Sequence, residues 1–338
     1  MGELKVGKTH FILYAFSLLF LLSCAGGGNE IHQSKRDNVL DVKDRLSALN
    51  LDDKFMMGQA TRAYVVNDYL VFKDYSSTDK MIHLFDKNTF KYIGSTGDLG
   101  QGPGEIISLG DVMISRDRKL LVADLGHFCI YSYDIDSLRN DTDYLPVIRY
   151  RINKELVPTY ITYLSDTLCY ATFVVAKDDK TYSRTIGKWN MRSDEVILME
   201  YEHPDVKDKQ SNYVYSQEHD ILVEYQGRAD LISIFDGEFN LLHNVYGPDW
   251  NDGDSKLLCF FPAVICKDYI IAAYEGSPYQ DYKLPTKLHV FRLNGEYVKT
   301  LETGKRIHFL SADEGNERLF LSFDDEMQFG YLDLKDLL

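Results

Sequence analysis

A segment that recurs about every 50 residues constrains the fold of this chain more than any other feature. Each copy has a polar or turn residue followed by a short apolar run, as in Asp-Tyr-Leu-Val-Phe at 68–72. The third apolar residue of each run marks the period, and the gaps between successive markers are 51, 48, 53, 48 and 50 residues. The six markers are Val71, Val122, Tyr170, Val223, Ile271 and Leu321. Six copies at a steady period indicate a fold built from one repeated supersecondary unit.

A second marker recurs in the same phase, where an alternating apolar stretch ends in an aromatic and then a polar residue. Its copies are Phe85, Tyr133, Trp189, Phe235 and Phe291, with Leu332 as a degenerate last copy. Turn residues follow most of them, and Asn294-Gly295 between two strand-like runs is a strong hairpin signal. Each unit therefore predicts four short strands in meander order. Short continuous apolar runs suit strands that neighbouring units cover on both faces. The sequence predicts an all-β six-bladed β-propeller with four antiparallel strands per blade.

The last unit is too short to complete its own blade, because only five residues follow Asp333. An unpaired edge strand promotes aggregation, so another segment should cover it. The residues just before the first blade are the natural candidate. We expect Asp53–Met57 to pair with the strand around Met327–Leu332 and so to close the ring as an N-terminal strand.

The first 24 residues have the three parts of an export signal. Lys5, Lys8 and His10 precede the apolar stretch 11–22, and a small serine stands before Cys24. Twelve residues make a helix of about 18 Å, which is shorter than a bilayer core of roughly 30 Å. The sequence Leu21-Leu22-Ser23-Cys24 resembles the lipobox of bacterial lipoproteins. That resemblance implies cleavage before Cys24 and a diacylglyceryl group on its sulfur; an ordinary secretory signal with an accidental cysteine is the alternative.

These features predict three regions: a lipoprotein signal peptide at 1–23, a flexible tether at 24–38 and the propeller at 39–338. The tether is rich in Gly, Asn, Gln and Ser, which favours a flexible chain. A lipid on Cys24 would anchor the protein to a bacterial membrane in the cell envelope, and we favour the outer membrane. The proposed closure would place the end of the tether beside the seam between blades six and one.

Composition narrows the partners and the redox chemistry. The formal net charge of −15 disfavours nucleic acid as a partner, because an acidic body repels phosphate. Four cysteines besides Cys24 could form disulfides, but three of them lie in apolar runs, which favours buried free thiols. The four are Cys129, Cys169, Cys259 and Cys266. No cofactor is predicted.

The loop Gly97–Glu105 is the most distinctive local sequence and should cross from blade one to blade two. Its part G-x-G-P-G-E, at 100–105, resembles a family of envelope six-bladed propellers described as TolB-like or NHL-like, many of which are lipoproteins. The resemblance implies a fold and an envelope location, and it implies no reaction. Glu105 either holds backbone N–H groups of its own loop or contacts a ligand.

Other candidate sites are weaker. The aromatic stretch 274–282 predicts a loop whose Tyr274, Tyr279 and Tyr282 could stack on sugars or anchor a protein partner, with packing between blades as the alternative. His83 and His289 hold matching positions in two blades, which favours packing over metal binding. We assign no catalytic residue and no metal ligand.

Three functional hypotheses follow. The first is a lipid-anchored binding or scaffold propeller whose ligand is a protein, peptide or glycan, because propellers present many loops on a rigid ring. The second is an envelope hydrolase or lyase that uses metal-binding carboxylates from several blades in the channel. The third is a structural member of a larger envelope complex. Carboxylates converging in the channel would favour the enzyme.

Overall fold

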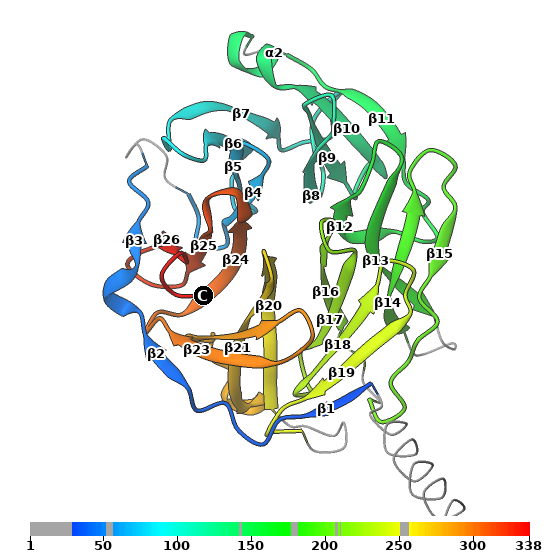
Figure 1. The fold of residues 1–338 in the computed structure, drawn as a ribbon. Helices are drawn as coiled ribbons and strands as arrows, with labels where there is room; N and C mark the ends of the chain where they lie inside the picture. The colour runs from blue at the N-terminus through cyan, green and yellow to red at the C-terminus, as the bar shows by residue number, and fades with distance from the viewer. Residues whose placement is uncertain are drawn as a thin grey trace, which may run out of the picture.

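A computed structural model describes residues 29–51, 57–141, 144–176, 182–206, 209, 211–250 and 257–338. Six sheets, antiparallel except for two N-terminal strands, stand around one central axis as the blades of a propeller (Figure 1). The predicted signal peptide, Cys24 and most of the predicted closing segment, Asp53–Met56, lie outside the described residues. Within the described part, no helix combines the length and apolar character needed to cross a bilayer.

Blades one to five each contain a four-stranded meander that begins at the axis and ends at the outer edge, and blade six contains three consecutive strands. Blade one contains β4 (Arg62–Val66), β5 (Tyr69–Lys73), β6 (Lys80–Asp86) and β7 (Tyr92–Asp98). Blade two contains β8 (Leu109–Ile114), β9 (Lys119–Asp124), β10 (Cys129–Asp134) and β11 (Val147–Arg151), with helix α2 (Ile135–Asn140) before its last strand. Blade three contains β12 (Pro158–Tyr163), β13 (Leu168–Ala176), β14 (Tyr182–Asn190) and β15 (Val196–Leu198).

The second half of the ring repeats this order. Blade four contains β16 (Ser211–Ser216), β17 (Ile221–Gln226), β18 (Leu231–Asp236) and β19 (Leu241–Tyr246). Blade five contains β20 (Leu257–Cys266), β21 (Tyr269–Pro278), β22 (Lys287–Arg292) and β23 (Tyr297–Glu302). Blade six contains β24 (Ile307–Asp313), β25 (Arg318–Phe323) and β26 (Phe329–Asp333).

The two sequence markers fall on the second and third strands of the blades, as the repeat predicts. The six apolar markers lie on β5, β9, β13, β17, β21 and β25, and each is at most 1 % exposed. The aromatic markers lie on the third strands and are equally buried. Middle strands are covered by the blade on either side, so both faces must be apolar. This packing explains why the repeat is visible in the sequence.

The N-terminal segment closes blade six, but through other residues than we expected. The closing strand is β3 (Ser47–Ala48), which pairs antiparallel with β26 through Tyr331 and Gly330. The prediction of Asp53–Met57 as the closing strand is therefore wrong in its position. Closure comes earlier because residues 30–41 already run along the two preceding blades and deliver the chain to blade six sooner.

The described part of the predicted tether is not a free linker. Strand β1 (Glu30–His32) pairs parallel with β19 of blade four, and β2 (Val39–Asp41) pairs parallel with β23 of blade five. Both blades thereby become five-stranded. Outer propeller strands expose unpaired N–H and C=O groups, and the N-terminal segment satisfies them in three successive blades. The segment at 29–48, which we call the strap, crosses the outer edges of blades four to six (Figure 1).

A buried ion pair fixes the strap between β1 and β2. Nη1 of Arg36 lies 2.7 Å from Oδ1 of Asp230, and the two side chains are 4 % and 0 % exposed. The guanidinium carbon also lies 5.1 Å from the ring centre of Phe291 and 5.5 Å from that of Phe260. A cation over aromatic faces is attracted by their negative π-clouds. Arg36 therefore joins the strap to blades four and five together.

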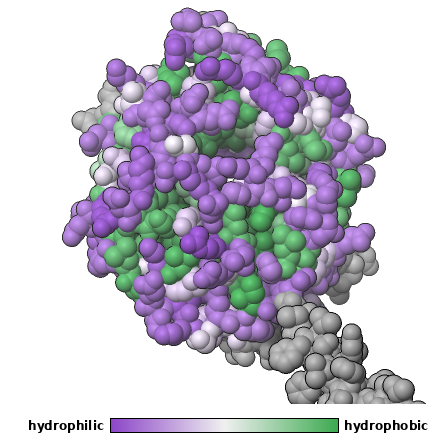
Figure 2. Space-filling model, in the orientation of Figure 1, coloured by the Kyte–Doolittle hydropathy of each residue, from purple (hydrophilic) through white to green (hydrophobic). Residues whose placement is uncertain are grey.

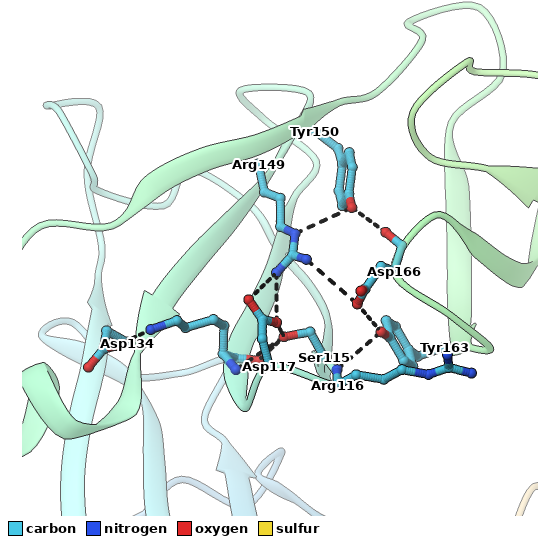
Figure 3. A network of polar contacts seen from close by, with 9 residues as sticks. Ser115, Arg116, Asp117, Asp134, Arg149, Tyr150, Tyr163 and Asp166 are labelled. Atoms are coloured by element: carbon cyan, nitrogen blue, oxygen red, sulfur yellow. Dashed lines mark hydrogen bonds and ion pairs between the residues drawn. The ribbon is translucent and has the colours of Figure 1, made fainter.

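Polar contacts join blades two and three at the ends of their inner strands (Figure 3). Arg149 lies 3.1 Å from Asp117 in blade two and 3.6 Å from Asp166 in blade three. The Tyr163 hydroxyl donates to Asp166 at 2.5 Å and accepts from the backbone N–H of Arg116 at 3.2 Å. Each of these groups has a partner within the network, so we interpret it as a structural connection between blades.

The four cysteines of the propeller are free and buried, as expected. Cys169 lies within the packed interface of blades two and three, and burial raises the pKa of its thiol. A thiol that stays protonated and shielded acts as a small apolar side chain.

Candidate functional site

The first strands of the blades surround the axis and start at the same end of the ring. Neighbouring inner strands contact one another around the axis, β8 with β12 and β20 with both β16 and β24 (Figure 1). Their first residues border a cavity of about 360 Å³ at one mouth of the channel. We call it the Arg62 cavity; its walls include Arg62, Tyr75, Asp111, Leu125, Tyr160 and His308.

A second cavity of about 260 Å³ adjoins the first on the side of blades three to five. We call it the Tyr279 cavity; its walls include Tyr160, Arg184, Asn212, Phe261, Tyr279 and Tyr282. Tyr160 belongs to both walls and therefore stands between the two cavities. Figure 2 shows one face of the ring, on which hydrophobic residues gather in patches among a mostly hydrophilic surface.

Four inner strands lose regular pairing where they border these cavities. Register shifts occur in β8 between Leu109 and Val112, in β12 between Thr159 and Thr162, and in β24 between Ile307 and Phe309. Two further shifts interrupt the first half of β20. A bulge turns a side chain away from the regular alternation and is common next to binding sites. These shifts fall at Asp111, Tyr160, Phe261 and His308.

The backbone of Tyr160 has an unusual conformation for its place in the fold. Among the described residues, ten non-glycine residues have positive φ; nine lie in turns between strands, and Tyr160, with φ of 52°, lies inside β12. A bulky residue in this region carries strain, which persists only where its surroundings hold it. The Tyr160 carbonyl accepts from the Tyr213 hydroxyl at 2.5 Å, and the next N–H, of Ile161, donates to Asp111 at 2.9 Å. Blades two and four thus hold the distorted turn from both sides.

A buried lysine explains why Asp111 is held in place. Nζ of Lys73, whose side chain is 1 % exposed, lies 3.1 Å from Asp111 Oδ1 and donates to the Gly110 carbonyl at 2.9 Å. Burial acts to lower the pKa of Lys73, but the Asp111 carboxylate, Tyr64 and Tyr75 together outweigh it and the pKa is raised. Lys73 therefore stays charged and neutralises Asp111. The pair joins blades one, two and three behind the Arg62 cavity.

Arg62 has no comparable partner. Its guanidinium carbon lies 5.6 Å from the ring centre of Tyr75 and 5.5 Å from that of Phe309, and no carboxylate of the described residues forms an ion pair with it. Its buried Nε has no hydrogen-bond partner in that part of the chain either. Burial and the nearby Arg62 charge lower the pKa of His308, so this imidazole is neutral at pH 7. The cavity therefore offers an unneutralised cation beside neutral polar groups.

Of the three candidate tyrosines, two are exposed beside a cavity and one is buried in a sheet. Tyr279 and Tyr282 line the Tyr279 cavity and are 55 % and 67 % exposed. Tyr274 is not part of the exposed loop, and that expectation is corrected. Strand β21 continues to Pro278, so Tyr274 is still within the sheet, where its ring packs 5.1 Å from Phe260 and its hydroxyl donates to Asp249 at 2.6 Å.

Glu105 lies in the loop between blades one and two and is not among the residues that line the two cavities. Its Oε2 accepts the backbone N–H of Gly102 at 2.6 Å. A Cβ on Gly100 would lie 1.9 Å from the same oxygen, and Gly104 has a φ of +79°. The glycines therefore make room for the carboxylate and for the turn. This geometry is the backbone-holding role considered for Glu105; contact with a ligand remains a prediction.

His83 and His289 make equivalent contacts, which agrees with the packing role expected for them. Nδ1 of His83 lies 2.7 Å from the Ser95 hydroxyl, and Nδ1 of His289 lies 2.8 Å from the Thr300 hydroxyl; each partner is on the outer strand of the same blade. Burial, and next the charge of Arg36, lowers the pKa of His289 to about 3. Within the described ranges, no group of three His, Cys, Asp or Glu side chains could hold a metal ion.

A hollow of about 500 Å³ also lies between β7 and α2, on the outer side of blade one. Its polar groups bond with one another, since the Tyr92 hydroxyl and His83 both contact the hydroxyl of Ser95. The acidic loop 249–254 offers several carboxylate and amide oxygens, but most of it lies outside the described residues. Asp249 itself is engaged by Tyr274.

Sequence reasoning missed Arg62, Asp111, Tyr160 and His308. A signal was present, because the residues at the start of the inner strands follow the 50-residue period. They are Arg62, Asp111, Tyr160, Asn212, Phe260 and His308, spaced by 49, 49, 52, 48 and 48 residues. The six positions are equivalent in the fold but are occupied by different amino acids. A search for a repeated residue type therefore does not find them.

Comparison with known proteins agrees with the architecture. Residues 28–247 match the DUF5128 family, which is described as a 6-bladed beta-propeller. The chain belongs to this family. The family match begins at residue 28, next to the strap, and not at residue 39, where the sequence predicted that the propeller starts. This earlier start agrees with the pairing of β1 with blade four. No curated protein matches the DUF5128 chain.

Solved structures share the fold of this DUF5128 protein at low sequence identity. A member of the duf4221 family from Bacteroides vulgatus superposes with a TM-score of 0.59 at 14 % identity, covering 85 % of this chain and 97 % of the other. A candidate exported protein from Bacteroides fragilis gives 0.54 at 11 %, covering 87 % and 88 %. A virginiamycin B lyase from Staphylococcus aureus gives 0.51 at 11 %, covering 85 % and 97 %. These likenesses concern the fold alone.

Proposed function

We propose that this DUF5128 protein is a lipid-anchored binding or scaffold protein of the cell envelope, which holds its ligand at the channel mouth beside Tyr160. One observation carries the proposal: four inner strands are distorted at the same end of the ring and turn side chains toward two adjoining cavities. Distortion costs stability, and it concentrates where side chains must be aimed at a ligand.

The Cys24 anchor would hold the body close to the bilayer. Only five residues separate Cys24 from Glu30, where β1 begins on blade four. An extended chain of this length reaches about 20 Å. We therefore place the outer edge of blade four next to the membrane, instead of the seam between blades six and one that the sequence first indicated.

Binding at the mouth is tested by screening the intact chain, purified in detergent, against immobilised glycan and peptide libraries. We expect at least one ligand whose binding falls at least 10-fold in Tyr160→Asn. Asparagine tolerates positive φ and keeps the backbone contacts, so this variant removes the ring without adding strain. Tyr92→Ala, on an outer strand, is the matched control and should bind like the wild type. Ligands that bind Tyr160→Asn unchanged would place the site elsewhere.

The anchor is tested by fractionation and by mass spectrometry of the mature N-terminus. The wild-type chain should start at a lipidated Cys24 and sediment with membranes, whereas Cys24→Ser should be released in a folded form. A mature N-terminus at another residue would contradict the lipoprotein assignment. Added protease acting on whole cells distinguishes a surface-facing body from a periplasmic one.

A further inference from the structure

Three of the eleven buried polar atoms that lack a hydrogen-bond partner within the described residues lie in the walls of the two cavities. They are Nε of Arg62, Oδ1 of Asn212 and Nδ1 of His308. Native proteins pair almost all buried polar atoms, because an unpaired one costs about 1–3 kcal/mol. Three such atoms around adjoining cavities indicate a ligand that brings several hydroxyl or carboxylate groups.

The charge of the walls favours an anion, although the whole chain has a formal charge of −15. Arg62 and Arg184 line the cavities, and the two carboxylates that line them are already engaged. Asp111 is neutralised by Lys73, while Glu275 accepts from a backbone N–H and from a serine hydroxyl. A guanidinium without a carboxylate partner is suited to bidentate binding of a ligand carboxylate.

Exposed tyrosine side chains around the cavities favour a ligand that contains sugar rings. Tyr75 and Tyr160 are 40 % and 39 % exposed, and Tyr279 and Tyr282 are more exposed still. An aromatic ring that is apolar on its face and polar at its hydroxyl suits the face of a sugar ring. Tyr160 borders both cavities, so a ligand that fills both must extend over more than one ring.

An extended peptide is less well matched to this mouth. Peptides that bind β-proteins commonly add a strand to a regular, unpaired edge. The inner strands here are interrupted at the mouth, and the Tyr160 carbonyl and the Ile161 N–H are already bonded to neighbouring blades. The mouth therefore offers side chains and few backbone partners.

We propose that the two cavities bind an acidic oligosaccharide, with its carboxylate on Arg62 and successive sugar rings on Tyr160 and Tyr282. The inference rests on the proposed binding function and narrows it to one ligand class. Asn212 and His308 accept hydrogen bonds from sugar hydroxyls. Arg62 selects the acidic sugar, and the tyrosines supply affinity that does not depend on charge.

Titration calorimetry of the intact chain in detergent tests this assignment. The probes are tetrasaccharides of galacturonate, hyaluronan and alginate, each compared with its methyl ester, together with a tetraglutamate peptide. The ester keeps the sugar rings and removes the charge. We expect one acidic tetrasaccharide to bind at least 10-fold more tightly than its ester, and added salt to reduce that difference.

Arg62→Gln should weaken binding of the acid about 10- to 100-fold and leave binding of the ester unchanged, because one charge-assisted contact is lost. Arg116→Gln, at the far end of the channel, is the matched control and should bind like the wild type. Tyr160→Asn should weaken both acid and ester.

Each contrary result has a distinct meaning. Equal affinity for acid and ester, or an unchanged acid preference in Arg62→Gln, overturns the carboxylate assignment and leaves a binding site at the mouth. Binding of tetraglutamate but of no acidic saccharide overturns the saccharide class, and so does the absence of binding to all three acids. Binding that is unchanged in Tyr160→Asn refutes the channel-mouth function itself.

Discussion

Replacing Arg36 with methionine should lower the free energy of unfolding by about 3–5 kcal/mol, because it leaves the Asp230 carboxylate buried without its counter-ion. Asp230 is fully buried, and among the described residues the remaining partner of its charged oxygens is the backbone N–H of Asp249 at 3.1 Å. Methionine keeps an unbranched stem against Phe260 and Phe291, so most of the apolar packing survives. The loss is therefore mainly electrostatic.

The size of this effect can be read in thermal and urea unfolding. At about 2 °C per kcal/mol for a domain of this size, the melting temperature should fall by roughly 6–10 °C. The chain has two tryptophans, and one of them, Trp250, packs 4.9 Å from Tyr246 close to Asp230. Tryptophan fluorescence therefore reports unfolding and also the state of the seam between blades four and five.

The variant should also acquire a pH dependence. Burial raises the pKa of Asp230, while Arg36 acts to lower it. Without Arg36 the folded-state pKa rises further above the unfolded value. A raised folded pKa gives stability that is present below the unfolded pKa and is lost as pH rises through the folded pKa. The deficit of Arg36→Met should therefore be larger at pH 8 than at pH 5.

Lys35→Met is the matched control, because Lys35 is the adjacent residue and its ion pair with Asp37 is 72 % and 66 % exposed. Exposed pairs contribute about 0–1 kcal/mol, so this variant should resemble the wild type. The double variant Arg36→Met, Asp230→Asn should recover part of the loss, since no buried charge is left unpaired. If Arg36→Met were no less stable than Lys35→Met, the strap would not depend on this ion pair.

Three further predictions concern the seams of the ring. Leu49→Pro removes the N–H that donates to the Phe329 carbonyl at 3.0 Å. It should lower the free energy of unfolding, measured in urea, by about 1–3 kcal/mol. Leu145→Pro, at an exposed position outside the strands, is the control and should lower it less. Asp313 is buried, which acts to raise its pKa, but Lys87, Asn316 and Arg318 together outweigh this and the pKa is lowered. Its stabilisation is therefore present above about pH 4 and is lost on acidification. Asp313→Asn should lose about 1.5–3 kcal/mol of stability at pH 7, and its stability should depend less on pH in the acid range. Gly104→Ala should lower the free energy of unfolding by about 1 kcal/mol or more in thermal unfolding, because φ is +79° and the new Cβ would lie 2.9 Å from Pro146. A stability equal to that of the wild type would mean that the loop rearranges freely.

The sequence was sufficient for the fold because the middle strands of every blade obey a local rule. Markers such as Val71 and Phe85 must be apolar wherever a strand is covered on both faces, so the rule repeats with the blade and is visible without a structure. The need for an N-terminal closing strand also followed from the sequence, because the short last unit leaves an edge strand unpaired. Its position at Ser47–Ala48 did not, since it depends on where the strap meets blades four and five.

Only the tertiary structure decided where the candidate site lies. Tyr279 and Tyr282 were recognisable as exposed aromatics in one loop, whereas Tyr274 was misplaced because β21 runs farther than its sequence suggests. Arg62, Tyr160 and His308 come from three blades and meet at the channel mouth. Arg62 lies on a regular strand, whereas Tyr160 and His308 lie at bulges, which leave no residue pattern in the chain. Local patterns determine which strands are buried; the closing of the ring determines which distant side chains meet, because that depends on the register of every blade at once.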